Sequence, residues 1–348
     1  MSVDGLQMRR KIQQLGSSTL AVTLPAEWTR EQSLSKGDEL IVQRDENGGS
    51  LLVVPERPKA TEATATIDAD SLTPESMRRA VLAQYVLGRQ LIEVESDGPF
   101  DPAVFDAIAE TERQLMGLGV VEEGIDTVAI RCSVDPGDFE LPTLMERLWR
   151  TEATMRTETV DRLLADDLDA ARRAVDRQRQ VEKLFYLFLR LVFTTYRNPR
   201  LNRSVGLETG FPLIGYRSVA QDVVLMAEAA RGVAELVIDT DGFALDDATG
   251  YHMEAVTEAL DRVASATRQA VTTPTTEATD DGHDAIDAFE GRVAEAQSHI
   301  EEARPEPLLE LQRTLTAFRR SGDHAGDSLD VATRFAFRST PAVFTDDG

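Results

Sequence analysis

The alternation of apolar and polar residues near the N-terminus predicts a small β-rich unit. Apolar residues occupy every second position from Leu20 to Leu24, which is the period of a strand buried on one face. Pro25 stands where the first turn of a helix tolerates proline, so a short helix is expected over residues 26–32. Apolar runs at residues 40–42 and 51–55 predict two further strands, with a hairpin connection over residues 45–49. The expected order is strand, strand, short helix, strand, strand.

Residues 62–136 mix strand and helix patterns and predict a compact α/β unit. Helices are expected to open at Thr73-Pro74 and Asp101-Pro102, where a capping side chain precedes a proline. The first of these helices is expected to carry Met77, Val81, Tyr85 and Leu87, and the second Val104, Phe105, Ile108 and Leu115. Strand patterns fall near residues 66–68, 91–95, 120–121 and 127–131. Because this unit has no glycine-rich phosphate loop and no nucleophile constellation, it is interpreted as a structural connector or a small-ligand module.

Residues 139–338 show apolar positions at spacings of three and four, which predicts six helices. The breaks fall at Asn198-Pro199, at Asp241-Gly242 and in the threonine-rich loop around Pro274. Six helices with short breaks after the third favour two antiparallel three-helix bundles, over 139–240 and 241–338. With the first unit at residues 1–58, the chain is expected to be a multidomain α+β protein.

The N-terminal pattern resembles the SpoVT/AbrB swapped-hairpin domain. The matching residues are Arg10-Lys11-Ile12 with Leu15-Gly16, then Leu24-Pro25-Ala26-Glu27, then Leu34 with Lys36-Gly37-Asp38. In that family two chains interleave into one small barrel that binds DNA, so the resemblance implies a homodimer. A unit this small, without a disulfide or a metal, also favours a second copy on physical grounds, because it cannot bury enough apolar surface alone.

The resemblance implies double-stranded DNA as a partner. The main candidates for contacts with phosphates or base edges are Arg9, Arg10 and Lys11. The remaining candidates are Gln13, Ser17, Ser18, Arg30 and Arg44. Ser17-Ser18 departs from the shortest family members, which carry an arginine there. The alternative interpretation of the basic triplet is a charged strand edge that blocks aggregation.

The helical region resembles the PhoU family of phosphate-uptake regulators, which are built from two three-helix repeats. The best match runs from Tyr216 to Ala220 and continues through Met226–Ala230 to Ala234–Leu236; Gln178–Leu184 and Gly322–Asp327 match further helices. An AbrB-like unit followed by a PhoU-like region is an order seen in archaeal regulators of this family. The resemblance therefore implies a phosphate-uptake regulator of the haloarchaeal type.

PhoU proteins also hold iron or zinc with pairs of acids spaced four apart, which face the same way on a helix. Here Val224 stands four residues before Glu228, and Gln178 stands four before Glu182, so each first-repeat pair has lost a carboxylate. No cofactor is therefore expected, and Glu182 and Glu228 remain weak metal candidates.

The second repeat retains one acidic pair. Asp323 and Asp327 keep the spacing of four, with His324 beside them, and they complete the weak metal candidates. In a chain this acidic, a solvated helix face is the favoured interpretation of the pair.

The charge distribution distinguishes the first unit from the rest. The chain has 37 basic and 61 acidic residues, a net charge of −24, and only Lys11, Lys36, Lys59 and Lys183 are lysines. This composition predicts a halophilic protein, because concentrated salt screens self-repulsion. Residues 1–60 hold eight basic and eight acidic residues, so the acidic excess lies entirely beyond residue 60. The first unit can therefore approach phosphate.

Several function classes are disfavoured. No apolar run is long enough to span a bilayer and no signal peptide is present, so a cytoplasmic protein without membrane insertion is expected. Cys132 is the single cysteine, which excludes an internal disulfide and predicts a buried, inert thiol. The four histidines lie on acidic helical stretches without a serine or cysteine at a suggestive spacing. The chain is not expected to be an enzyme.

Two hypotheses follow. In the first, the chain is a dimeric transcription regulator whose N-terminal barrel holds promoter DNA while the helical region senses or relays phosphate status. In the second, the barrel serves only dimerisation, and the helical region docks on the ATPase of a phosphate transporter or on a sensor kinase.

Overall fold

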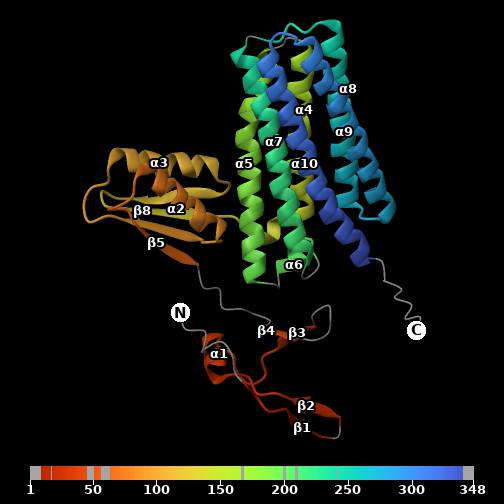
Figure 1. Cartoon of the computed structure of the whole chain (residues 1–348). Coiled ribbons are helices and arrows are strands. Elements are labelled where there is room, and N and C mark those ends of the chain that lie inside the picture. Colours follow the sequence, from red (N-terminus) through yellow and green to blue (C-terminus); the bar gives the residue numbers. More distant parts are fainter. Residues whose placement is uncertain are drawn as a thin grey trace, which may run out of the picture. The chain divides into compact units, whose positions relative to one another are not determined.

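A computed structural model describes residues 9–16, 18–44, 51–55, 63–165, 168–198, 201–207, 211–240 and 242–339. The chain divides into two compact units, Met1–Glu62 and Ala63–Gly348 (Figure 1). The second unit contains both the α/β part and the helical part.

The first unit contains short strands and one helix in the expected order. Its elements are β1 (Gln13–Leu15), β2 (Thr19–Ala21), α1 (Ala26–Glu31), β3 (Leu40–Arg44) and β4 (Leu51–Pro55). β1 pairs with β2 and β3 pairs with β4, both antiparallel. The strand expected to reach Leu24 ends at Ala21, because Ala21 pairs with Gln13, the first residue of β1. The expected hairpin connection at residues 45–49 lies outside the described residues.

The apolar side chains of the first unit are exposed within one copy of the chain. Leu20 keeps 68% of its surface accessible, Val22 keeps 57% and Leu15 keeps 60%. Helix α1 buries no residue, and Pro55 is the only buried side chain among those that the structure describes in this unit. The first unit therefore has no core of its own among its described residues.

The α/β part of the second unit has a four-stranded sheet. Its elements are β5 (Thr64–Asp68), α2 (Pro74–Val86), β6 (Leu91–Glu95), α3 (Pro102–Gln114), β7 (Leu118–Glu123) and β8 (Thr127–Cys132). The strand order is β5-β6-β8-β7, in which β5 and β6 are parallel and the other pairs antiparallel. Helices α2 and α3 lie side by side over one face of this sheet (Figure 1).

The predicted helix starts of this part are confirmed. The Thr73 hydroxyl oxygen accepts a hydrogen bond from the Ser76 backbone N–H at 3.2 Å, and an Asp101 carboxylate oxygen accepts one from Ala103 at 2.8 Å. Met77, Val81 and Tyr85 lie on α2 as expected and are buried. Leu87 lies just beyond the helix, because α2 ends at Val86, and it caps α2 with 37% of its surface exposed.

The remainder of the second unit is helical. A 3₁₀ turn at Pro136–Asp138 leads into α4 (Leu141–Ala165), α5 (Leu168–Arg197), α6 (Leu201–Ser204), α7 (Phe211–Asp239), α8 (Asp247–Thr272), α9 (Thr276–Ala303) and α10 (Leu308–Ser339). The six long helices confirm the periodicity, and α6 is a short addition. Helices α4, α5 and α7 pack together, as do α8, α9 and α10, and α7 packs along α10 where the two groups meet (Figure 1). In the described residues, no helix is both long and apolar enough to cross a bilayer.

Two arginines of α5 connect the helical part to the α/β part through hydrogen bonds to backbone carbonyl oxygens. The buried Arg190 guanidinium donates hydrogen bonds to the carbonyl oxygens of Tyr85 at 2.7 Å and Arg89 at 3.0 Å, and it lies 5.0 Å from the Tyr85 ring centroid. Arg197 donates to the Leu87 carbonyl at 2.9 Å. These carbonyls are at the C-terminal end of α2, where backbone oxygens lack helical partners and attract positive charge. Burial lowers the pKa of Arg190.

Candidate functional site: a basic segment and three carboxylate groups

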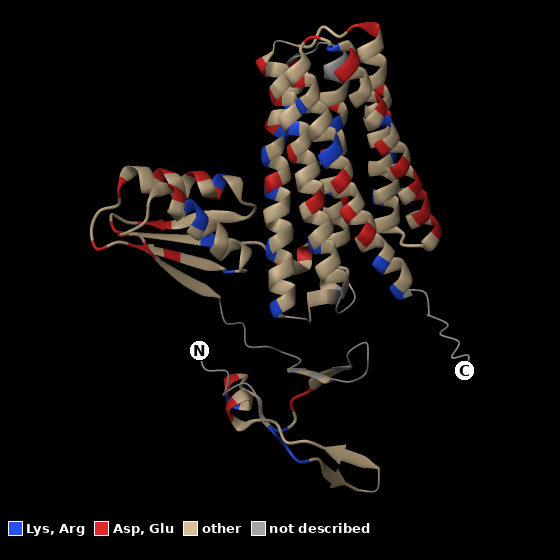
Figure 2. Ribbon diagram, viewed as in Figure 1, with Lys and Arg blue, Asp and Glu red and all other residues tan. Residues whose placement is uncertain are grey.

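The first candidate is the basic segment that enters β1. Arg9, Arg10 and Lys11 are consecutive and exposed, and Gln13, exposed as well, opens β1. In Figure 2 the ribbon that leads into β1 is blue, the colour of Lys and Arg. Cations and an amide on such a segment can reach phosphate oxygens and base edges.

The other predicted contact residues are distributed over the first unit. Ser18 is exposed in the turn between β1 and β2, and Arg30 is exposed on α1, where its Nε donates to the Ala26 carbonyl at 3.2 Å. Ser17 and the side chain of Arg44 lie outside the described residues. Of the described candidates, Arg9, Arg10, Lys11 and Gln13 lie close together because they are neighbours in the sequence, whereas Ser18 and Arg30 lie on other elements.

The first carboxylate group contains Glu182 on α5 and Glu228 on α7. Burial raises the pKa of Tyr186, and the negative charges of both glutamates raise it further. Gln178, almost fully buried, donates its amide N–H to Glu182 at 3.2 Å. Val224 is 4% exposed at the position where the matching acid of the PhoU pattern would stand. An amide donor and a valine thus stand where the PhoU pattern has two carboxylates.

The second carboxylate group joins α7 to α10. Ligand atoms of Asp222, His324 and Asp327 all lie within 4.8 Å of one another, and His324 Nδ1 is 3.8 Å from an Asp327 carboxylate oxygen. The fully buried Ser328 donates its hydroxyl to Asp222 at 3.1 Å. One imidazole and two carboxylates, one of them held by the Ser328 hydrogen bond, are ligands that suit a divalent transition metal.

Burial raises the pKa of Asp222 to about 6, with the Ser328 hydrogen bond opposing the shift and Asp327 adding to it. No local pattern in the sequence predicts this role for Asp222, because its partners are about one hundred residues away in the chain. An acid within the apolar face of α7, one residue before the buried Val223, was the pattern that could have drawn attention to it.

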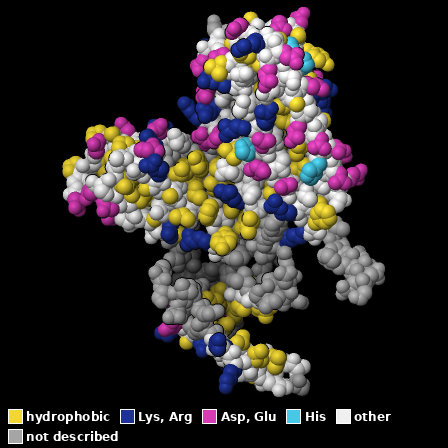
Figure 3. Space-filling model, viewed as in Figure 1, with side chains coloured by type: hydrophobic (Ala, Val, Ile, Leu, Met, Phe, Trp, Pro, Cys, Tyr) yellow, Lys and Arg dark blue, Asp and Glu magenta, His cyan; other side chains and the backbone are white. Residues whose placement is uncertain are grey.

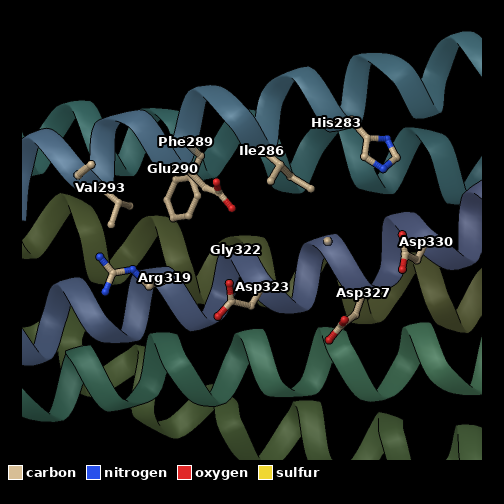
Figure 4. Close-up of a pocket in the computed structure, with 12 residues that line it drawn as sticks. His283, Ile286, Phe289, Glu290, Val293, Arg319, Gly322, Asp323, Asp327 and Asp330 are labelled. Atoms are coloured by element: carbon tan, nitrogen blue, oxygen red, sulfur yellow. The ribbon is translucent and has the colours of Figure 1, made fainter.

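The third group lines a groove of about 520 Å³ between α9 and α10. Asp323, Asp327 and Asp330 lie along α10 opposite His283 and Glu290 of α9 (Figure 4). Apolar side chains also line the groove: Ile286, Phe289 and Val293. Gly322 permits this close approach of the helices, because a Cβ there would lie 2.3 Å from a Phe289 ring carbon. Arg319 adds one cation, so the groove combines apolar side chains with an excess of carboxylates.

Comparisons with known proteins bear on both units. Residues 13–61 match the family model of the bacterial antitoxin MazE, whose description is "Antidote-toxin recognition MazE, bacterial antitoxin". The first unit is MazE/AbrB-like. The crystal structure of PhoU from Pseudomonas aeruginosa is similar to this chain with 12% sequence identity and a TM-score of 0.49, and the match covers 57% of this chain and 96% of that one. No curated protein matches the chain.

Proposed function

We propose that this chain is a DNA-binding transcriptional regulator of phosphate uptake. The observation that carries the proposal is the MazE/AbrB-like unit, whose exposed basic segment precedes a hairpin with unburied apolar side chains. Domains of this type are dimeric and bind DNA. A second copy covers Leu20 and Val22 in a closed barrel, and the two copies of Arg9–Lys11 then contact one duplex.

The phosphate role rests on the sequence resemblance of the helical region to PhoU. In this proposal the cytoplasmic dimer holds promoter DNA through residues 9–18, while residues 139–338 sense or relay phosphate status. The helical region does so without catalysis and without the family's multinuclear metal cluster, because Glu182 and Glu228 lack their partner ligands. The acidic composition adapts the protein to a salty cytoplasm.

The acidic groove between α9 and α10 favours a second candidate function. Its apolar lining and its carboxylates suit a basic amphipathic segment of a partner protein. The helical region would then be an adaptor for a phosphate-transport ATPase or a sensor kinase, and the first unit would serve dimerisation alone.

Footprinting on phosphate-transport promoters separates these two functions. We expect the full chain to protect a discrete site, and a variant lacking residues 139–338 to protect the same site without any response to phosphate. The adaptor function predicts no protection by either protein at any concentration that leaves unrelated DNA free.

A further inference from the structure

A second cavity, of about 410 Å³, lies where the α/β part meets the helical part, and its lining is basic. Arg147 and Arg150 reach it from α4, and Gln180 and Lys183 reach it from α5. Met116 of the loop between α3 and β7 borders it from the α/β part, and Thr151 and Leu184 complete the lining. Arg147, Arg150 and Gln180 are exposed, so the cavity is open to solvent. The cavity is within the size range of small-molecule sites.

This lining contains no carboxylate, which is unusual in a chain with 61 acidic and 37 basic residues. Acidic side chains are scattered over the visible face of the helical region (Figure 3). Two other arginines, both on α5, form ion pairs with acidic side chains: Arg177 pairs with Glu158 at 2.8 Å, and Arg172 pairs with Asp169 at 3.0 Å. Arg147 and Arg150, by contrast, form no ion pair with any residue that the structure describes.

The spacing of the lining residues places the hydrogen-bond donors of each helix on the face that borders the cavity. Arg147, Arg150 and Thr151 are three and four residues apart on α4, and Gln180, Lys183 and Leu184 repeat that spacing on α5, so each set shares one helix face. The Thr151 hydroxyl proton is already donated to the Arg147 carbonyl at 2.8 Å. Lys183 donates to the Arg113 carbonyl at 3.4 Å and retains further N–H groups. Two guanidinium groups, an ammonium and an amide therefore remain as donors.

We infer that this cavity binds a phosphoryl group, as inorganic phosphate or as a phosphomonoester. Guanidinium groups match the geometry of phosphate oxygens with paired N–H donors, and three converging cations favour a dianion over a monovalent ion. The inference rests on the proposed function and deepens it, because it names the ligand through which phosphate status reaches the helical region. A bound dianion would also relieve the mutual repulsion of the three cations at the junction with the α/β part.

The test is calorimetric titration of the full chain, free of DNA and at constant ionic strength in chloride. Inorganic phosphate is compared with adenosine monophosphate, and acetate and adenosine serve as the anion and nucleoside controls. We expect saturable binding of at least one phosphoryl ligand with one site per chain, and no binding of the two controls. The ligand that binds identifies the source of the phosphoryl group.

The matched variants are Arg147→Gln/Arg150→Gln and Arg313→Gln/Arg320→Gln. Both remove two positive charges, but the second pair is exposed on α10, away from the cavity. Loss of charged hydrogen bonds should weaken binding by on the order of 10-fold per arginine in the first variant only. Equal weakening in both variants, unchanged affinity in the first, or no binding of either phosphoryl ligand to the wild type overturns the assignment. DNA binding is measured separately, so failure here leaves the promoter footprint intact.

Discussion

The two units of this chain solve the problem of apolar burial in different ways. In the helical part, Leu148 and Phe188 are completely buried by neighbouring helices of the same chain. In the first unit, Leu20 and Val22 carry the alternating pattern of a buried strand, yet both keep more than half of their surface exposed. Apolar side chains that stay exposed in one copy of the chain favour binding of another molecule that buries them. We therefore expect the second unit to fold on its own and the first unit to fold only when it assembles with another molecule.

The strongest way to break this comparison is a charge at Leu20. We expect Leu20→Asp to abolish the dimer and the fold of the first unit, because the substitution buries an unpaired carboxylate in the shared barrel. Light scattering of the full chain at several concentrations measures the mass. The control is Thr19→Asp, which adds the same charge on the opposite face of β2. A wild-type monomer, or a Leu20→Asp protein that remains dimeric, contradicts the interleaved barrel.

A core truncation in the second unit should have a large effect confined to that unit. Phe188→Ala removes a completely buried ring from α5 and should lower the free energy of unfolding by about 3–5 kcal/mol. Phe193→Ala on the same helix is the control, since Phe193 is 38% exposed and its truncation should cost under about 1 kcal/mol. Chemical denaturation followed by circular dichroism gives both values. If the two variants are equally destabilised, the packing of α5 described above is wrong.

Asp222 should produce a smaller, pH-dependent effect. Its pKa of about 6 in the folded chain exceeds the ordinary value of 3.8, so the fold favours the protonated carboxyl. The stability that this gives is fully present below pH 4 and is lost as pH rises through 6. With a chelator present, Asp222→Asn should therefore stabilise the chain at pH 8 by about 1 kcal/mol, a value discounted for partial exposure.

At pH 4 the Asp222→Asn difference should vanish. Thermal denaturation at the two pH values measures it. A stabilisation by Asp222→Asn that is the same at both pH values would show that burial of the charged carboxylate is not its cause.

Metal removal should have the smallest effect on the fold. The six long helices are held by apolar packing, which does not depend on a metal ion. Extended chelation should leave the helical circular dichroism and the melting temperature unchanged. Melting of residues 139–338 on chelation would show that a metal site supports the bundles.

The sequence predicted the elements of this protein better than their contacts. The spacing of apolar residues and the caps at Thr73 and Asp101 are local, so they identified helices that the structure confirms. The proximity of Asp222 to His324 and Asp327 depends on how α7 packs along α10, which no local pattern specifies. The cavity around Arg147 and Arg150 could not be predicted from the sequence for the same reason, because its lining residues come from α4, α5 and the α/β part.

The central claim, that the basic segment of the first unit holds DNA, is tested most directly by a binding titration. Wild type is compared with Arg10→Ala/Lys11→Ala and with Arg313→Ala/Arg320→Ala, which removes the same charge from α10, on a phosphate-regulated promoter from 0.1 M to molar salt. We expect the Arg10/Lys11 variant to lose about 1–3 kcal/mol of binding free energy per residue, and the α10 variant to bind as wild type. The loss should persist at molar salt, where counterion release contributes little. Equal binding by wild type and Arg10→Ala/Lys11→Ala would contradict the account and leave the first unit with dimerisation alone.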